Sequence, residues 1–127
     1  MSYEEIADMI AAPEIGYVTL VGSTEVGREL YRTVASKRFI DVGLELGGKD
    51  SAYVHSDADP KAAAEGAVDG ACYNAGQSCC AIERIYVHEA IYDEFLHEAE
   101  KIVKGYVLGD PLDAATNMGP LTDLKAP

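Results

Sequence analysis

Apolar residues follow two kinds of pattern along the chain. Short continuous runs, such as Tyr17 to Val21, are rich in β-branched side chains and are typical of buried strands. In the next segment Val26, Leu30 and Val34 recur every four residues, which predicts a helix. Over the whole chain the two patterns predict helices at 3–11, 25–36, 60–74 and 90–104, and strands at 17–21, 39–46, 52–54 and 84–88.

The order of these elements indicates the fold class. Strands alternate with helices, and a helix that connects two strands favours parallel pairing. We therefore expect an α/β fold whose strands form part of an open, mostly parallel, Rossmann-like sheet. Asp59 and Pro60 support the start of the third helix, because Asp caps a helix N-terminus and Pro is tolerated in the first turn.

Charge narrows the possible functions. The chain of 127 residues has a formal net charge of −12, from 22 acidic and 10 basic residues. This balance argues against nucleic acid and against an anionic membrane surface, since both are bound through Lys and Arg. No apolar run reaches the roughly 18 residues of a membrane span. The N-terminus lacks the basic-then-apolar pattern of a signal peptide, so we expect a cytoplasmic protein.

Two of the three cysteines are candidates for chemistry. Cys79 and Cys80 are adjacent and follow Gly76, which permits a sharp bend that would expose them. Peptide N–H groups near Cys79 could stabilise an oxyanion. The alternative is a buried, inert thiol, and these residues alone do not say which cysteine acts. There is no Cys-x-x-Cys and no histidine at ligand spacing, so neither a metal site nor a disulfide framework is expected.

Two further segments carry polar residues where strands end. Glu45 ends an apolar strand, where burial would suit it to act as a general base; the alternative is a solvated or ion-paired carboxylate. Gly47 and Gly48 after it would let a ligand approach the backbone closely. Upstream, Gly22 and Ser23 lie between a strand and a helix, where free N–H groups can hold a phosphate, unless this is an ordinary capped turn.

Together the three segments resemble the NAD(P)-dependent aldehyde dehydrogenase superfamily. Its Gly-Ser-Thr-x-x-Gly pattern matches 22–27, its Glu-Leu-Gly-Gly-Lys pattern matches 45–49, and its Gly-Gln-x-Cys pattern matches 76–79. The segments at 109–111 and 118–121 also fit, so the resemblance covers nearly the whole chain. Ser51 and Cys72 depart from the residues usual in the family, which affects packing more than chemistry.

The resemblance implies a covalent mechanism for oxidising a small-molecule aldehyde. The Cys79 thiolate would attack the carbonyl, with its own backbone N–H as an oxyanion donor, and hydride would pass to NAD(P)+. Glu45 would then activate the water that hydrolyses the thioester. Gln77 is expected to shape the loop rather than react.

The resemblance also implies a cofactor site and a domain division. Gly22 and Ser23 would face the pyrophosphate, and Leu46 and Gly47 would lie near the nicotinamide. Residues 1–76 would be the C-terminal half of the cofactor-binding domain, and 77–127 the start of the catalytic domain.

The chain is about a quarter of the length of a typical member. We therefore expect little or no dehydrogenase activity from it alone, while full-length relatives would be homo-oligomers. The alternatives are a non-catalytic remnant that serves as an interaction module, and a cysteine hydrolase that pairs Cys79 with His88.

Overall fold

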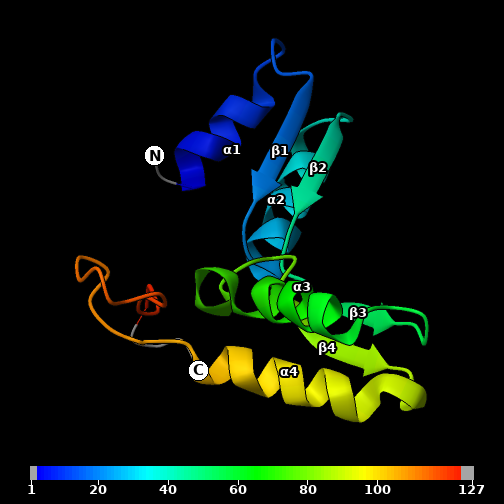
Figure 1. Cartoon of the computed structure of the whole chain (residues 1–127). Coiled ribbons are helices and arrows are strands. Elements are labelled where there is room, and N and C mark those ends of the chain that lie inside the picture. Colours follow the sequence, from blue (N-terminus) through cyan, green and yellow to red (C-terminus); the bar gives the residue numbers. More distant parts are fainter. Residues whose placement is uncertain (1–2, 124–127) are drawn as a thin grey trace. The chain divides into compact units, whose positions relative to one another are not determined.

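Two α/β units, divided between Gly47 and Gly48, make up the chain (Figure 1). The computed structural model describes residues 3–123. It confirms the expected fold class: β1 pairs with β2 in the first unit and β3 with β4 in the second, and both pairs are parallel. The division into cofactor-binding and catalytic domains after Gly76 concerns function, and it stays a prediction.

In the first unit two helices cover one face of a two-stranded sheet. Alternate residues of a strand point to the same face, so Val18 and Leu20 of the first strand share a cluster with the helices. The buried centre of that cluster is Ile10, Leu30 and Val34. The elements are α1 (Tyr3–Ala11), β1 (Tyr17–Val21), α2 (Thr24–Lys37) and β2 (Asp41–Glu45).

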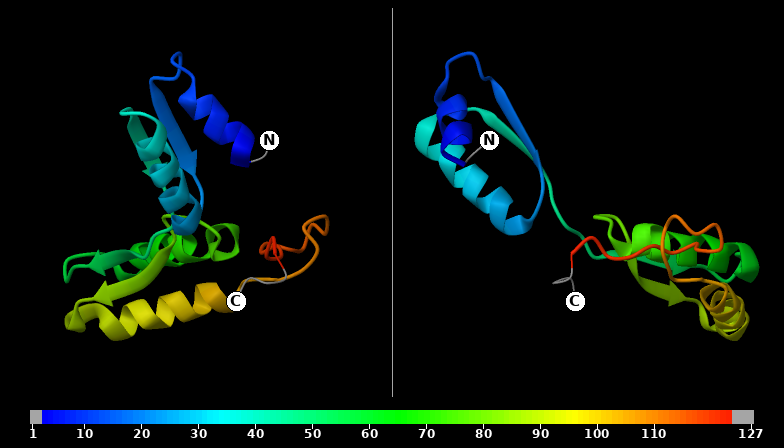
Figure 2. Two further views of the ribbon diagram at one scale, coloured as in Figure 1. Left: turned by 180° about the vertical axis from the view of Figure 1, so that it is seen from behind. Right: turned by 90° about the vertical axis from the view of Figure 1, so that its left-hand side faces the viewer.

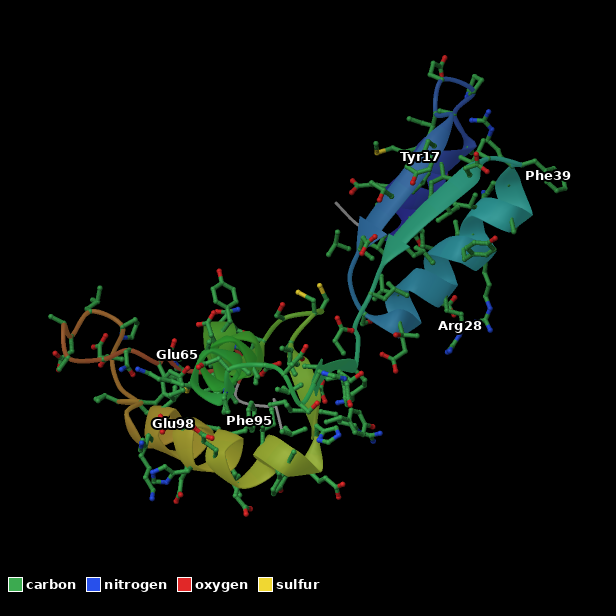
Figure 3. All side chains as sticks on the ribbon, turned by 45° about the vertical axis from the view of Figure 1, so that its right-hand side comes forward. Tyr17, Arg28, Phe39, Glu65, Phe95 and Glu98 are labelled. Carbon is green, nitrogen blue, oxygen red and sulfur yellow. The ribbon has the colours of Figure 1, made fainter. Side chains whose placement is uncertain are left out.

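The second unit packs two helices on a second parallel pair. Phe95, labelled in Figure 3, belongs to the same buried cluster as Val54, Ala64 and Ala67. The small alanine side chains of α3 let α4 approach closely, and the two helices lie side by side in both views of Figure 2. The elements are β3 (Asp50–Val54), α3 (Pro60–Cys72), η1 (Tyr73–Gly76), β4 (Ile82–Val87), η2 (Glu89–Ile91) and α4 (Tyr92–Lys104).

The predicted start of α3 is confirmed, because the Asp59 carboxylate accepts a hydrogen bond of 2.7 Å from the Ala62 N–H and Pro60 opens the helix. The predicted end is wrong by two residues, since the helix stops at Cys72. No helix within residues 3–123 combines the length and apolar character that crossing a bilayer requires.

Candidate active site

Cys79 lies in a loop of residues 77–81, here called the thiol loop, which connects η1 to β4. Its thiol is free and its side chain is exposed. Four backbone N–H groups of this loop donate hydrogen bonds: those of Gln77 to Asn74 O (3.1 Å), Ser78 to Gly76 O (3.0 Å), Cys80 to Ser78 Oγ (3.4 Å) and Ala81 to Ser78 O (3.2 Å). The N–H of Cys79 has no acceptor among the described residues. It is therefore available to a developing oxyanion beside the sulfur.

Three successive left-handed residues lead into the thiol loop. The φ angles are 52° at Asn74, 57° at Ala75 and 77° at Gly76. Glycine adopts this conformation freely and Asn tolerates it, whereas Ala is strained there by about 1 kcal/mol. The bend predicted at Gly76 is thus a turn of three residues, which also explains why α3 ends early.

The side chain of Gln77 connects this turn to a distant segment. Its Nε2 donates to Asn74 O (2.9 Å). Its Oε1 accepts from the Thr122 N–H (2.8 Å) and from Thr122 Oγ1 (3.1 Å). Sequence reasoning did not single out Thr122, because residues 118–127 have little periodicity and this contact spans 45 positions.

Gly48 lies against the backbone of the thiol loop. A Cβ atom added at this position would lie 2.4 Å from the carbonyl oxygen of Cys79, a distance that real Cβ atoms essentially never show. The adjacent Lys49 forms an ion pair with Glu83 at the start of β4. The second half of the Glu-Leu-Gly-Gly-Lys segment is thus positioned beside the candidate nucleophile, within the second unit.

The first half of that segment belongs to the first unit. Glu45 ends β2 opposite Val21, and its carbonyl accepts from the N–H of Gly22 (3.0 Å). The structure therefore brings Gly22 and Glu45 together. The sequence left a buried and a solvated carboxylate open for Glu45, and the structure has the solvated one: its side chain is exposed where β2 ends.

Leu46 packs on the helix that follows Gly22. A Cβ atom added at Gly27 would lie 2.8 Å from Leu46 Cδ2, so the last glycine of the Gly-Ser-Thr-x-x-Gly pattern allows this close approach. Gly47, by contrast, has no heavy atom within 4 Å of such a Cβ position.

Ser23 is the N-cap of α2. Its Oγ accepts from the Val26 N–H (3.2 Å), so the capped turn that the sequence left open is present. The N–H groups of Thr24 and Glu25 have no acceptor in the described part of the chain, and they lie at an exposed helix N-terminus. The cap and an anion site are therefore compatible.

The predicted site residues thus fall into two groups. Gly22, Ser23, Glu45, Leu46 and Gly47 lie in the first unit, and Cys79 lies in the second. The convergence of Glu45 and Cys79 on one pocket stays a prediction. Across residues 3–123 there is no cluster of three or more His, Cys, Asp or Glu side chains that could hold a metal ion.

The sequence model of the aldehyde dehydrogenase family matches residues 3–126. This chain belongs to the aldehyde dehydrogenase family. Aldehyde dehydrogenase 1 of Tanacetum cinerariifolium is 47% identical over 107 residues, which cover 84% of this chain and 21% of that protein. Hydroxyisobutyraldehyde dehydrogenase of Mycolicibacterium austroafricanum is 44% identical over 119 residues, which cover 94% of this chain and 23% of that protein. The chain therefore spans less than a quarter of the length of these relatives.

Solved structures of aldehyde dehydrogenases share the fold. The structure of 3,6-anhydro-L-galactose dehydrogenase in complex with NAP superimposes with a TM-score of 0.82 at 37% identity, covering 92% of this chain and 24% of that one. An NAD-dependent aldehyde dehydrogenase from Sinorhizobium meliloti gives a TM-score of 0.78 at 37% identity, covering 88% of this chain and 22% of that one. The chain is thus an α/β segment of the aldehyde dehydrogenase fold.

Proposed function

We propose that this chain carries the nucleophile, the general base and part of the cofactor site of an enzyme that oxidises an aldehyde to a carboxylic acid with NAD(P)+. The observation that carries the proposal is the thiol loop. It presents an exposed, free thiol beside the N–H group of the same residue. The other four N–H groups of the loop have acceptors, whereas that of Cys79 has none among the described residues. Membership of the aldehyde dehydrogenase family supports the same chemistry.

The first step is covalent. The Cys79 thiolate forms a bond from sulfur to the carbonyl carbon of the aldehyde, and the π electron pair moves to the oxygen. The Cys79 N–H stabilises that oxyanion, which is more reactive toward loss of hydride than the free aldehyde. Glu45 takes a proton from the water that later releases the acid from Cys79. The exposed side chain of Glu45 has access to the water that this step consumes.

The first unit fits the anionic part of a dinucleotide. The free N–H groups of Thr24 and Glu25 lie at the N-terminus of α2, where the helix dipole favours an anion. At Gly22 the nearest atoms to an added Cβ are 3.7 Å away on Leu20, so the backbone remains open to a ligand. Gly22 and Ser23 would hold the pyrophosphate, and Leu46 and Gly47 would flank the nicotinamide. When bound, the nicotinamide supplies the hydride acceptor.

The wider assignments follow from the same proposal. Residues 1–76 serve cofactor binding and 77–127 begin the catalytic part, although residues 48–76 fold with the latter. The full-length protein would act in the cytoplasm as a homo-oligomer; one relative from Rattus norvegicus is named as cytosolic.

The test uses acetaldehyde labelled with ¹³C at its carbonyl. Added to the purified 127-residue chain, it should give a thiohemiacetal signal assigned to Cys79, which Cys79→Ala removes and Cys72→Ala retains. An adduct no more abundant at Cys79 than at Cys80 would contradict the proposal and favour the non-catalytic interaction module. Dehydrogenase turnover by this chain alone is expected to be negligible.

A further inference from the structure

We infer that Gln77 and Thr122 form a clamp that positions Cys79 for attack on the aldehyde. The inference rests on the proposed function, because it assigns both residues to the same thiol. In this role Gln77 and Thr122 are positioning residues: neither needs to contact the substrate. The clamp consists of the hydrogen bonds from Thr122 N–H (2.8 Å) and Oγ1 (3.1 Å) to Gln77 Oε1.

Both polar atoms of the Gln77 side-chain amide form hydrogen bonds. Its oxygen accepts two hydrogen bonds from Thr122, while its Nε2 donates to Asn74 O (2.9 Å). The main chain of Gln77 repeats the link to the turn, since its N–H donates to Asn74 O (3.1 Å) and its carbonyl accepts from Asn74 Nδ2 (3.0 Å). The main-chain bonds do not depend on the side chain, but only a side chain with a donor and an acceptor at this length reaches both Asn74 O and Thr122.

Thr122 follows a segment that is hydrogen-bonded into the second unit. The segment before it is held by backbone hydrogen bonds from Met118 N–H to Val107 O (3.2 Å) and from Gly109 N–H to Met118 O (3.3 Å). Residues 118–120 also line, with Asn74 and Ala75, a cavity of about 290 Å³. The clamp therefore connects the thiol loop to a segment that already borders the preceding turn.

The consequence for Cys79 follows from its position two residues after Gln77. The three left-handed residues before the loop include the strained Ala75, so the turn needs restraint from outside itself. With Gln77 fixed, the other N–H groups of the loop donate to the loop itself and to the turn before it, and that of Cys79 stays free. Loss of the clamp should let the loop relax and misalign this N–H with the oxyanion that forms when sulfur adds to the carbonyl.

The experiment measures the formation constant of the thiohemiacetal at Cys79 and, as an internal reference, at Cys80. The 127-residue chain is labelled with ¹⁵N and titrated with the ¹³C-labelled acetaldehyde. Gln77→Met keeps the length of the side chain but removes its polar atoms, and should lower the constant at Cys79 about tenfold. Thr122→Val removes only the Oγ1 bond and should lower the formation constant at Cys79 about threefold. Thr122→Ser keeps a hydroxyl and should leave this constant at the value of the parent chain.

A purely structural role would act on both thiols. If the clamp positions Cys79, the ratio of adduct at Cys79 to adduct at Cys80 falls, and the Cys79 amide loses the shift that aldehyde induces in the parent chain. The inference is overturned if both constants fall together, or if Gln77→Met and Thr122→Val match the parent. Should Gln77→Met fail to fold, the ratio of adduct at Cys79 to adduct at Cys80 in Thr122→Val and Thr122→Ser decides the question. An absence of any preferred Cys79 adduct in the parent refutes the proposed function instead.

Discussion

The contact between Gly48 and the Cys79 carbonyl gives a quantitative prediction for Gly48→Ala. The new Cβ would lie 2.4 Å from that oxygen, whereas ordinary contact begins at 3.4 Å, so one of the two backbones must move by 3.4 − 2.4 = 1.0 Å. The oxygen belongs to the main chain and cannot rotate away. A displacement of that size near a reacting atom costs about 10²-fold in rate, and forcing a methyl into a packed site costs about 1–3 kcal/mol.

Two measurements on the 127-residue chain test this. The rate of thiohemiacetal formation at Cys79 should fall about 10²-fold. The free energy of unfolding from urea denaturation should fall by about 1–3 kcal/mol. Gly66→Ala is the matched control, because a Cβ in α3 meets nothing within 4 Å and should stabilise the helix by about 1 kcal/mol. A folded Gly48→Ala chain with unchanged Cys79 amide shifts and an unchanged rate would refute the reasoning.

Three other changes test the surrounding structure. Ala75→Gly should relieve the left-handed strain, although the greater entropy of glycine in the unfolded chain offsets part of the gain. The free energy of unfolding measured in urea should therefore rise by about 0.5 kcal/mol, and a decrease would show that Ala75 is not strained. Ser23→Ala should lower the free energy of unfolding by about 1 kcal/mol, because it removes the N-cap of α2, whereas Ser36→Ala near the end of the same helix should leave it unchanged. The hydrogen bond and charge of His55 hold the pKa of Asp57 below its ordinary 3.8, so the stabilisation from this pair is present above pH 3.8 and lost as the pH falls through the folded-state pKa. His55→Ala should raise the pKa of Asp57 in a ¹³C carboxyl titration, and an unchanged value would exclude the pair as the cause.

The elements that the sequence predicted well are those whose burial is periodic. The helix expected at 3–11 and the strand at 17–21 match α1 and β1, because their apolar residues form one side of a core. The strand expected at 52–54 begins earlier, at Asp50, since Asp50 and Ser51 are polar, exposed residues that join the ladder through backbone pairing with β4. Backbone hydrogen bonding leaves no hydrophobic signal in such residues.

Only those features of the site that depend on residues adjacent in sequence were predictable. The Gly-Gln-x-Cys pattern identified the thiol loop, but the left-handed conformation of Ala75 has no sequence signal, because alanine favours helices. The partnership of Gln77 with Thr122 depends on tertiary structure, and so does the contact of Gly48 with Cys79. The exposure of Glu45 depends on what covers the end of β2, which the apolar run before it did not reveal.

The boundary between Gly47 and Gly48 falls inside a run of five residues that supplies both units. A gene cut at this peptide bond would place the carboxylate of Glu45 and the sulfur of Cys79 on separate polypeptides. On the proposed mechanism, adduct formation at Cys79 would survive such a cut, whereas release of the acid through Glu45 would require the two pieces to reassociate.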